Sequence, residues 1–339
     1  MIKFVASFRL ALCALVVLAG LAVTFAGAAR ARCAGSNVLA KLTQSHPDIM
    51  QRVRDEAAHI RNTGAVLWRV EKPGLDASHL FGTLHVSDPR VMEMRRPARD
   101  ALRDARTVAL EIADMSPKAM MTAIAKVPQL MVYTDGVRLR DKLSAVEFKK
   151  VSKLLSGSGV PAQMAAVIRP WMVNTLLAMP NCEQQRIAGG ALVLDQRIAR
   201  IARERKIPVV GLETIAHQFR SMANIPDADQ LAMLRVSLAF AKERENLFET
   251  MIQIYLDRDI GMVLTLSRGL AKIAGLKKSG FAAMDRELLR KRNFGMFDVS
   301  VPLVEQGKAF VAVGAAHLVG DTGLVALYRK AGFTVTAVK

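Results

Sequence analysis

Two segments near opposite ends of the chain share one local pattern, which constrains the fold more than any other feature. Residues 81–88 (FGTLHVSD) and 313–321 (VGAAHLVGD) each follow a run rich in β-formers, place glycine three residues before histidine, and reach an aspartate positioned to cap a helix. A strand that ends in this way presents its imidazole at the rim of the sheet, where open α/β sheets bind ligands. We therefore expect His85 and His317 to meet in one polar, metal-binding site. The alternative, in which both are capping or core histidines with satisfied hydrogen bonds, stays open.

Short strand-like runs flank a long helical stretch. The runs are AVLWRV at 65–70, HLFGTL at 79–84, TVALEI at 107–112, IPVVGL at 207–212, AFVAVG at 309–314 and FTVTAV at 333–338. Turn residues join the first two runs as a β-hairpin. The sequence therefore predicts an α/β fold, with a mixed central sheet of short strands from both ends of the chain and a long helical middle section packed around it.

Apolar residues at helical spacing predict where the helices lie. The predicted helices cover 37–61 with an interruption near Pro47, 89–104, 141–155, 161–178, 190–205, much of 227–306, and 322–331 with a stop at Gly332. Residues 157–161 (GSGVP) form a clear break between two of them.

The N-terminus has the form of a secretory signal peptide. Lys3 and Arg9 precede a charge-free apolar run at 10–29, which ends in a small-residue cleavage signal at 26–28. We predict a signal peptide over 1–28, an N-terminal arm and helix over 29–61 and a main domain over 62–339, in a periplasmic or secreted protein. In the alternative, residues 10–29 remain attached as an inner-membrane anchor.

Two cysteines, Cys33 and Cys182, remain after the signal segment. In an oxidising compartment two leftover thiols tend to pair, so a Cys33–Cys182 disulfide is predicted. The bond would pin the N-terminal arm to the helical middle of the chain. Two free buried thiols are the alternative.

The chain is strongly basic, with a formal net charge of +18. Its basic residues are scattered and lack the interleaved aromatic residues of nucleic-acid platforms, so we expect a solvated basic surface and no nucleic-acid partner. Contact of a basic face with an anionic surface stays open.

A metal site with two histidines needs a third ligand, and hydrolytic sites commonly use a carboxylate. Glu111 and Glu213 lie at the ends of apolar runs, where an unpaired acid would be costly. An arginine salt bridge is the alternative for each. Asp195, within an apolar helix, fits an ion-pair or capping role better than a ligand role. Arg292 either holds a carboxylate or lies solvated at the surface.

Several hydrolase motifs are absent from the sequence. It contains no His-Glu-x-x-His, no Gly-x-Ser-x-Gly and no Walker A motif. His217 follows Glu213 at a spacing of four, which ligand pairs also use, but an exposed helical histidine is the simpler interpretation.

Motifs in order along the chain resemble those of the TraB/PrgY/GumN family, which is similar to the Tiki metalloproteases. They are LWRVEKPG, SHLFGTLHVSD, TVALEI, YTDG, RPW, GLET, RN and FVAVGAAHLVGDTGLVALYRKAGFTV, spread over residues 62–338. The resemblance implies metal-dependent peptide hydrolysis, with two Gly-x-x-His motifs and a glutamate as the central residues. Those positions fall on His85, His317 and Glu111.

We therefore predict an exported metal-dependent hydrolase that acts on a peptide or protein substrate. His85, His317, Glu111 and Glu213 are the candidate ligands of a manganese, cobalt or zinc ion. Glu111 would serve as third ligand or as the base, and Arg292 would neutralise developing charge. The alternative is a non-enzymatic periplasmic binding protein for a peptide or glycan, or an accessory protein of polysaccharide biosynthesis.

Overall fold

A six-stranded mixed sheet forms the centre of the computed structural model, which describes residues 33–276 and 281–339. The strand order is β4-β3-β5-β2-β1-β6. The strands are β1 (Leu67–Glu71), β2 (Ser78–Thr83), β3 (Thr107–Leu110), β4 (Val209–Gly211), β5 (Ala309–Gly314) and β6 (Thr334–Ala337). The predicted α/β fold with strands from both ends of the chain is confirmed. The predicted signal peptide and the alternative membrane anchor lie outside the described residues.

Strand pairing gathers the ends of distant segments at one edge of the sheet. β5 runs parallel to β2 and to β3, with Thr83 opposite Gly314 and Leu110 opposite Ala312. β1 pairs antiparallel with β2, as the predicted hairpin requires, and with β6 on its other side. The carboxyl ends of β2, β5 and β3 therefore lie side by side.

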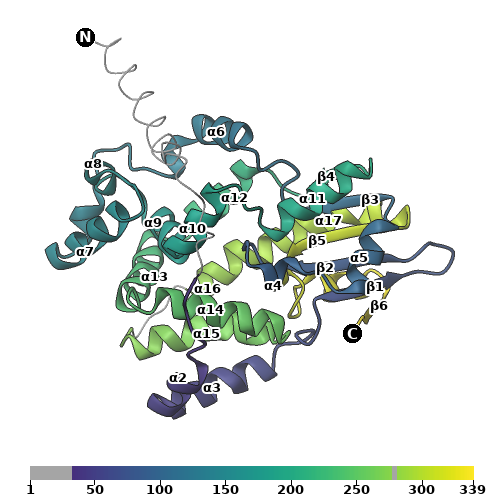
Figure 1. Ribbon diagram of the computed structural model, residues 1–339, viewed down its shortest axis with the longest axis horizontal. Coiled ribbons are helices and arrows are strands. Elements are labelled where there is room, and N and C mark those ends of the chain that lie inside the picture. The colour runs from purple at the N-terminus through teal and green to yellow at the C-terminus, as the bar shows by residue number, and fades with distance from the viewer. Residues whose placement is uncertain (1–32, 277–280) are drawn as a thin grey trace, which may run out of the picture.

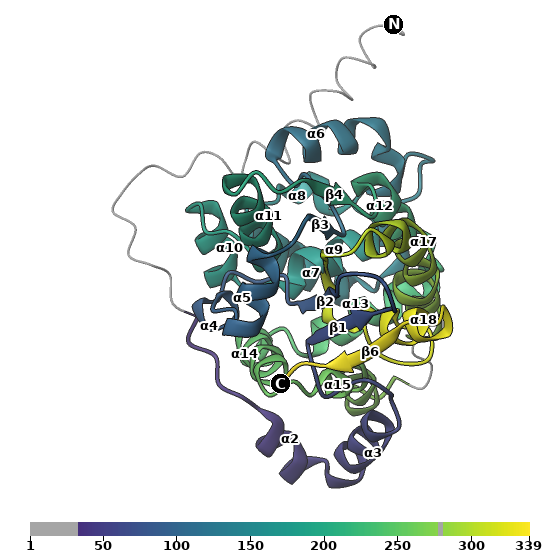
Figure 2. The ribbon, with the colours of Figure 1, turned by 90° about the vertical axis from the view of Figure 1, so that its right-hand side faces the viewer.

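Helices cover both faces of this sheet (Figure 2), with α5 and α11 on one side and α17 and α18 on the other. Because both faces are covered, the central strand β5 is an unbroken apolar run. Its residues 309–313 are all buried, as are Leu80 of β2 and Val108 of β3.

The other regular elements of the described residues are helical. The α-helices are α2 (Leu39–Ser45), α3 (Pro47–Ala58), α4 (Pro89–Met92), α5 (Arg96–Arg103), α6 (Pro117–Lys126), α7 (Ala145–Ser156), α8 (Ala162–Ala165), α9 (Pro170–Ala178), α10 (Asn181–Ala188), α11 (Leu194–Glu204), α12 (Ile215–Ala223), α13 (Asp227–Ala239), α14 (Arg244–Leu256), α15 (Ile260–Ile273), α16 (Phe281–Met284), α17 (Lys291–Glu305) and α18 (Leu324–Lys330). Shorter turns are η1 (Pro128–Leu130), η2 (Leu139–Lys142) and η4 (Ala315–His317), and η3 (Asp285–Arg290) is π-helical.

The sheet lies at one end of the molecule and a helical half lies at the other (Figure 1). Two further apolar clusters stabilise the helical half. One joins α7, α9 and α13 around Leu155, Val173 and Leu234, and the other joins α3 to α14 and α15 around Met50 and Leu266.

Proline breaks two helices that the sequence pattern predicts as continuous. Pro97 and Pro170 lack the backbone N–H that a continuing helix would donate, so the predicted helices at 89–104 and 161–178 each divide into two. Helix α10 lies in the helical middle section, but its individual bounds were not predicted. Asp88 caps α4 as expected, accepting from the Arg90 N–H at 3.0 Å, but Gly323 and not Asp321 precedes α18.

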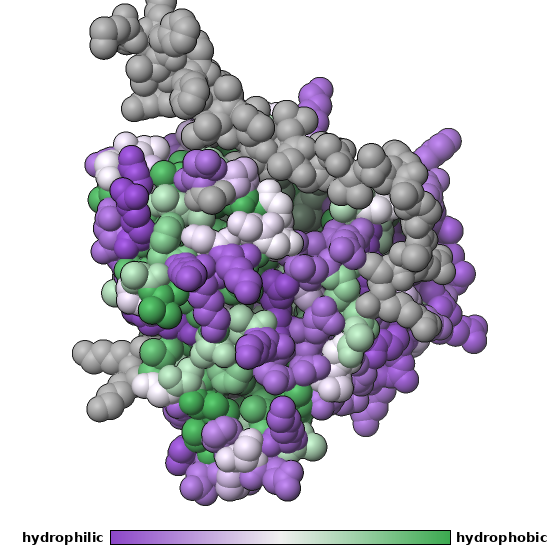
Figure 3. Space-filling model, turned by 60° about the vertical axis from the view of Figure 1, so that its left-hand side comes forward, coloured by the Kyte–Doolittle hydropathy of each residue, from purple (hydrophilic) through white to green (hydrophobic). Residues whose placement is uncertain are grey.

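Apolar residues at the surface are dispersed. Figure 3 shows them interspersed with polar and charged residues on one face. Among the described residues, the exposed large apolar side chains Leu75, Met115 and Val146 lie in different segments, and Phe294 and Val299 share α17. Within residues 33–276 and 281–339, no helix has the length and apolarity needed to cross a membrane.

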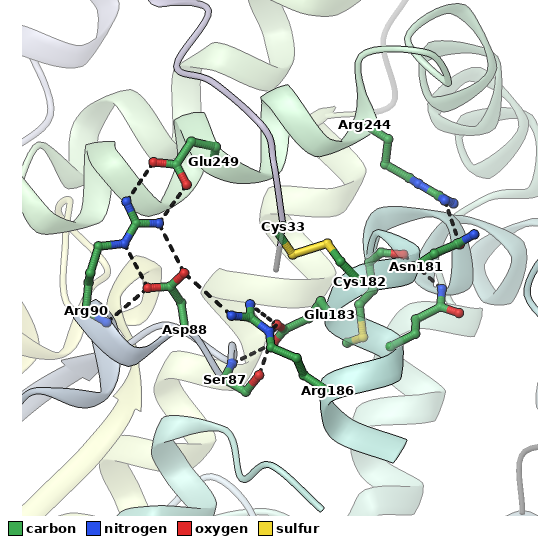
Figure 4. The surroundings of a disulfide bond; sticks show 12 residues. Cys33, Ser87, Asp88, Arg90, Asn181, Cys182, Glu183, Arg186, Arg244 and Glu249 are labelled. Carbon is green, nitrogen blue, oxygen red and sulfur yellow. Dashed lines mark hydrogen bonds and ion pairs between the residues drawn. A yellow bond between two sulfur atoms is a disulfide. The ribbon is translucent and has the colours of Figure 1, made fainter. Parts of the chain in front are cut away.

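The predicted disulfide is confirmed. Cys33 and Cys182 are bonded, with a Cα–Cα distance of 5.2 Å, across a sequence separation of 149. The bond ties the segment before α2 to the first turn of α10 (Figure 4). The N-terminal arm is thus fastened to the helical middle of the chain.

Candidate metal centre

The structure brings the two Gly-x-x-His histidines together. His85 lies two residues beyond the end of β2, and His317 lies in η4, directly after β5. The Nε2 atoms of both rings lie 3.7 Å from the same atom, Oε1 of Glu111, which follows β3. Three strand ends therefore deliver two imidazoles and a carboxylate to one point.

A buried carboxylate fixes the ring of His85. Its Nδ1 lies 2.7 Å from Oδ2 of Asp195, on α11, and Oδ1 of Asp195 accepts a hydrogen bond from the Thr83 hydroxyl at 2.8 Å. The ion-pair role expected for Asp195 thus has a specific partner. With Nδ1–H donating to the carboxylate, Nε2 faces Glu111.

A buried amide fixes the ring of His317. Nδ1 lies 2.6 Å from Oδ1 of Asn293, and Nδ2 of Asn293 donates to the carbonyl of Thr322 at 2.9 Å. Because the amide already donates through Nδ2, its Oδ1 accepts from Nδ1–H of His317. The Nε2 lone pair of His317 then faces Glu111. Metal-binding histidines are commonly oriented by partners of these two kinds.

Glu111 is held through both of its oxygens. Oε1 accepts the Gly314 N–H at 2.6 Å, and Oε2 accepts from Arg292 at 2.7 Å and Gln218 at 2.9 Å. Burial alone would raise the pKa of this carboxyl. Attraction to the protonated forms of His317 and His85, to Arg292 and to the Gly314 N–H instead holds the pKa well below its usual range. Glu111 is therefore an anion with little tendency to accept a proton.

Arg292 is buried between two glutamates, so the alternative of a solvated surface arginine is wrong. Its Nη2 donates to Glu111 at 2.7 Å and to Glu213 at 2.9 Å. Burial works against the charged form, but the two carboxylates outweigh it and raise the pKa of Arg292.

Glu213, predicted as a ligand, lies one layer behind the histidines. Its oxygens face Arg292, Gln218 and, at 3.4 Å, Nδ1 of His217. His217 itself is half-exposed on α12, as expected for a surface histidine. The structure therefore groups Glu111, but not Glu213, with His85 and His317.

The two rings differ in their environment. Burial lowers the pKa of His317 to about 4, so this ring is neutral at neutral pH. Asp195 raises the pKa of His85 to about 9, although 54% of that side chain is exposed and solvent moderates the effect. A neutral Nε2 facing a carboxylate is unfavourable unless a positive charge lies between them.

Gly314 leaves space for such a charge. A Cβ atom on Gly314 would lie 3.2 Å from both Oε1 of Glu111 and Nε2 of His85, and 3.6 Å from Cδ2 of His317. The absent side chain thus creates a cradle between the three groups. The donor types, the ring orientations and this cradle fit a divalent cation.

The donors stand slightly wider apart than in a closed coordination sphere. Donors at 2.0–2.2 Å from one ion lie roughly 3.0–3.6 Å from each other, whereas the Nε2–Oε1 distances are 3.7 Å. Among the described residues no group of three or more His, Cys, Asp or Glu stands at metal-holding spacing. Both imidazoles would have to come slightly closer to Glu111 to complete a coordination sphere.

Comparisons with known proteins identify a family model and two relatives that match this chain. The TraB/PrgY/gumN family model matches residues 66–337, which include every residue of the centre. "Uncharacterized protein YbaP" of Shigella flexneri is 22% identical over 289 residues, covering 83% of this chain and 100% of that protein. Its Escherichia coli (strain K12) counterpart is 21% identical over the same coverage. No solved structure matches.

Proposed function

Because the chain belongs to the TraB/PrgY/gumN family, we propose that it is an exported metal-dependent hydrolase, most similar to the Tiki metalloproteases, that cleaves peptide bonds. One observation carries the proposal: two imidazoles, each anchored through Nδ1, converge on one oxygen of Glu111 above a glycine. The Cys33–Cys182 disulfide supports export, because such bonds are typical of oxidising compartments.

His85, His317 and Glu111 would hold the cation. Two imidazoles and one carboxylate suit zinc, cobalt or manganese. When bound, such a cation supplies Lewis acidity, which polarises a carbonyl group and lowers the pKa of water. Because Asp195 raises the pKa of His85, cation binding would compete with protonation of that ring.

The environment of Glu111 favours the ligand role over the base role. Its lowered pKa makes it a poor proton acceptor, while its fixed charge would attract a cation. Arg292 acts as a positioning residue, because its guanidinium bridges Glu111 to Glu213. Glu213 in turn keeps Arg292 in place and stays outside the ligand set.

The substrate would approach from the side of His85. The His85 side chain is half-exposed, whereas Glu111 and His317 are buried. A peptide carbonyl could therefore reach the centre past His85, and the buried groups would keep bulk water away from the far side.

A non-enzymatic binding protein is the second candidate, and one observation favours it. The two carboxylates that touch the histidines are fully engaged: both oxygens of Glu111 and both of Asp195 accept hydrogen bonds. Neither is free to act as a general base. In that case the centre would bind its metal or ligand without turnover.

Metal binding is tested with a matched pair of variants of residues 29–339. Glu111→Gln and Glu213→Gln each remove one carboxylate from Arg292, so both should destabilise the fold. Only Glu111→Gln, like His85→Ala and His317→Ala, should lose bound metal, measured by elemental analysis after dialysis. Equal metal content in all four variants and the wild type would refute the metal centre.

Hydrolysis is tested with a peptide library. The wild type should cleave library members, lose this activity in EDTA and regain it with manganese, cobalt or zinc. Retained metal with no cleavage of any library member would favour the binding protein.

A further inference from the structure

The loop between β2 and α4, residues 84–88, carries His85. Val86 packs into the main apolar core, and polar contacts hold the part of the loop that follows it. Because the His85 ring is half-exposed, its burial cannot fix the loop. Two residues further on, Ser87 donates its backbone N–H to Oε1 of Glu183 at 2.5 Å and its hydroxyl to Oε2 at 3.0 Å. The Glu183 carboxylate thus holds the loop through both the backbone and the side chain of Ser87.

Glu183 lies on α10 and is completely buried, so its position depends on its partners. Arg186 donates Nε to it at 2.9 Å. Arg186 also lies 3.8 Å from Asp88, and Asp88 pairs with Arg90 at 2.9 Å. Figure 4 shows this chain of alternating charges, which ends where Arg90 meets Glu249 of α14 at 2.6 Å.

A covalent bond holds the other end of this network. Cys182 directly precedes Glu183 and is bonded to Cys33 of the N-terminal arm (Figure 4). The arm is fastened to α14, where the Ser36 N–H donates to Asn246 at 2.9 Å and the Val38 N–H to Thr250 at 3.0 Å. The arm, α14, the His85 loop and α10 are therefore joined in a closed ring of contacts.

We infer that Glu183 is a positioning residue for His85, and that the Cys33–Cys182 disulfide keeps Glu183 in place. If the disulfide is absent, the first turn of α10 is free to shift, and the carboxylate that holds Ser87 shifts with it. The inference rests on the proposed metal centre and adds a form of regulation to it. The centre reaches full metal affinity only after the disulfide has formed, which couples metal loading to an oxidising compartment.

The test uses the mature protein and three changes away from the ligands: Cys33→Ser with Cys182→Ser, Glu183→Gln, and Ser87→Ala. The matched control is Glu147→Gln, because Glu147 also pairs with an arginine and caps a backbone N–H, but on distant α7. Hydrogen exchange of residues 84–88 is measured on metal-free protein, and zinc affinity is measured by competition with a chromophoric chelator.

Glu183→Gln and the double cysteine variant should speed exchange at 84–88 about tenfold or more, since a hydrogen bond to a charged group is lost or loosened. Their zinc affinity should fall about 10- to 100-fold, as for other outer partners of metal ligands. Ser87→Ala keeps the backbone hydrogen bond and should show a smaller effect. Glu147→Gln should change neither quantity.

Unchanged exchange and unchanged zinc affinity in Glu183→Gln would overturn the inference, even if the cysteine variant fails to fold. Faster exchange with wild-type zinc affinity would overturn the coupling to the metal centre. If the wild type itself binds no metal, the proposed function fails. Exchange at 84–88 and the NMR signal of the His85 ring then still decide whether Glu183 positions the loop.

Discussion

Gly314→Ala adds one methyl group at the centre of the proposed cation site. The backbone of Gly314 has φ −51° and ψ 134°, a conformation that alanine adopts without strain. The Gly314 N–H that binds Glu111 is also retained. The new Cβ, however, would lie 3.2 Å from Oε1 of Glu111 and from Nε2 of His85, closer than ordinary van der Waals contact.

Gly314→Ala should therefore lower the metal affinity while leaving the free energy of unfolding nearly unchanged. A glycine-to-alanine change at a compatible position stabilises a protein by about 0.4–1 kcal/mol through the unfolded state. The tight contacts offset part of this, so we expect an unfolding free energy within about 1 kcal/mol of wild type. Metal affinity should fall at least about 100-fold, because changes in outer partners alone cost 10- to 100-fold and the methyl group displaces two ligands directly.

Gly82→Ala is the matched control from the other Gly-x-x-His segment. Its Cβ would meet Cα and Cβ of Ala315 and Cδ1 of Leu318, all at 3.0 Å, and not the ligand atoms. It should lose about 1–3 kcal/mol of stability by overpacking. Its metal affinity should fall less than that of Gly314→Ala. Urea unfolding in EDTA and chelator competition measure the two quantities. Wild-type metal affinity in Gly314→Ala would refute the proposal that the cation occupies the space left by Gly314.

Three further outcomes follow from individual contacts. Asp195→Asn should weaken zinc affinity about 10- to 100-fold in the same competition assay, and a change below twofold would contradict its role in orienting His85. Cys33→Ser opens a loop with a sequence separation of 149 and should lower the unfolding free energy by up to about 5 kcal/mol; an unchanged urea midpoint would argue against this. Burial, followed by the charge of Arg69, lowers the pKa of His79. As far as His79 is concerned, the free energy of unfolding should be highest above the unfolded pKa of about 6.5 and should decrease as pH falls below that value. NMR titration should give a pKa below that value, rising in Arg69→Gln; a higher value in the wild type would be inconsistent with this environment.

Much of the sheet could be predicted because its signals are local. The unbroken apolar run 309–314 indicated a covered strand, and β5 is indeed central and buried. The convergence of His85, Glu111 and His317 followed from their places at strand ends, since parallel neighbours bring such ends to one edge.

The partners of these residues could not be predicted in the same way. Asp195 and Asn293 reach the histidines from α11 and α17, and such contacts depend on how helices pack across a sheet. Asn293 also follows the π-helical segment η3, which shifts the register of the helix in a way that spacing rules do not anticipate. Glu183 lies on α10, a short helix between breaks, where the sequence offered no strong periodicity.

The place of β5 in the sheet has a consequence for chain synthesis. β5 separates β2 from β3 and is their common neighbour, yet it lies near the end of the sequence. A chain that stops before residue 309 would leave the β1–β2 hairpin and the β3–β4 pair with exposed apolar edges, the kind of edge that promotes aggregation. Damage to the C-terminal segment should therefore appear first as insoluble protein, before any loss of function can be measured.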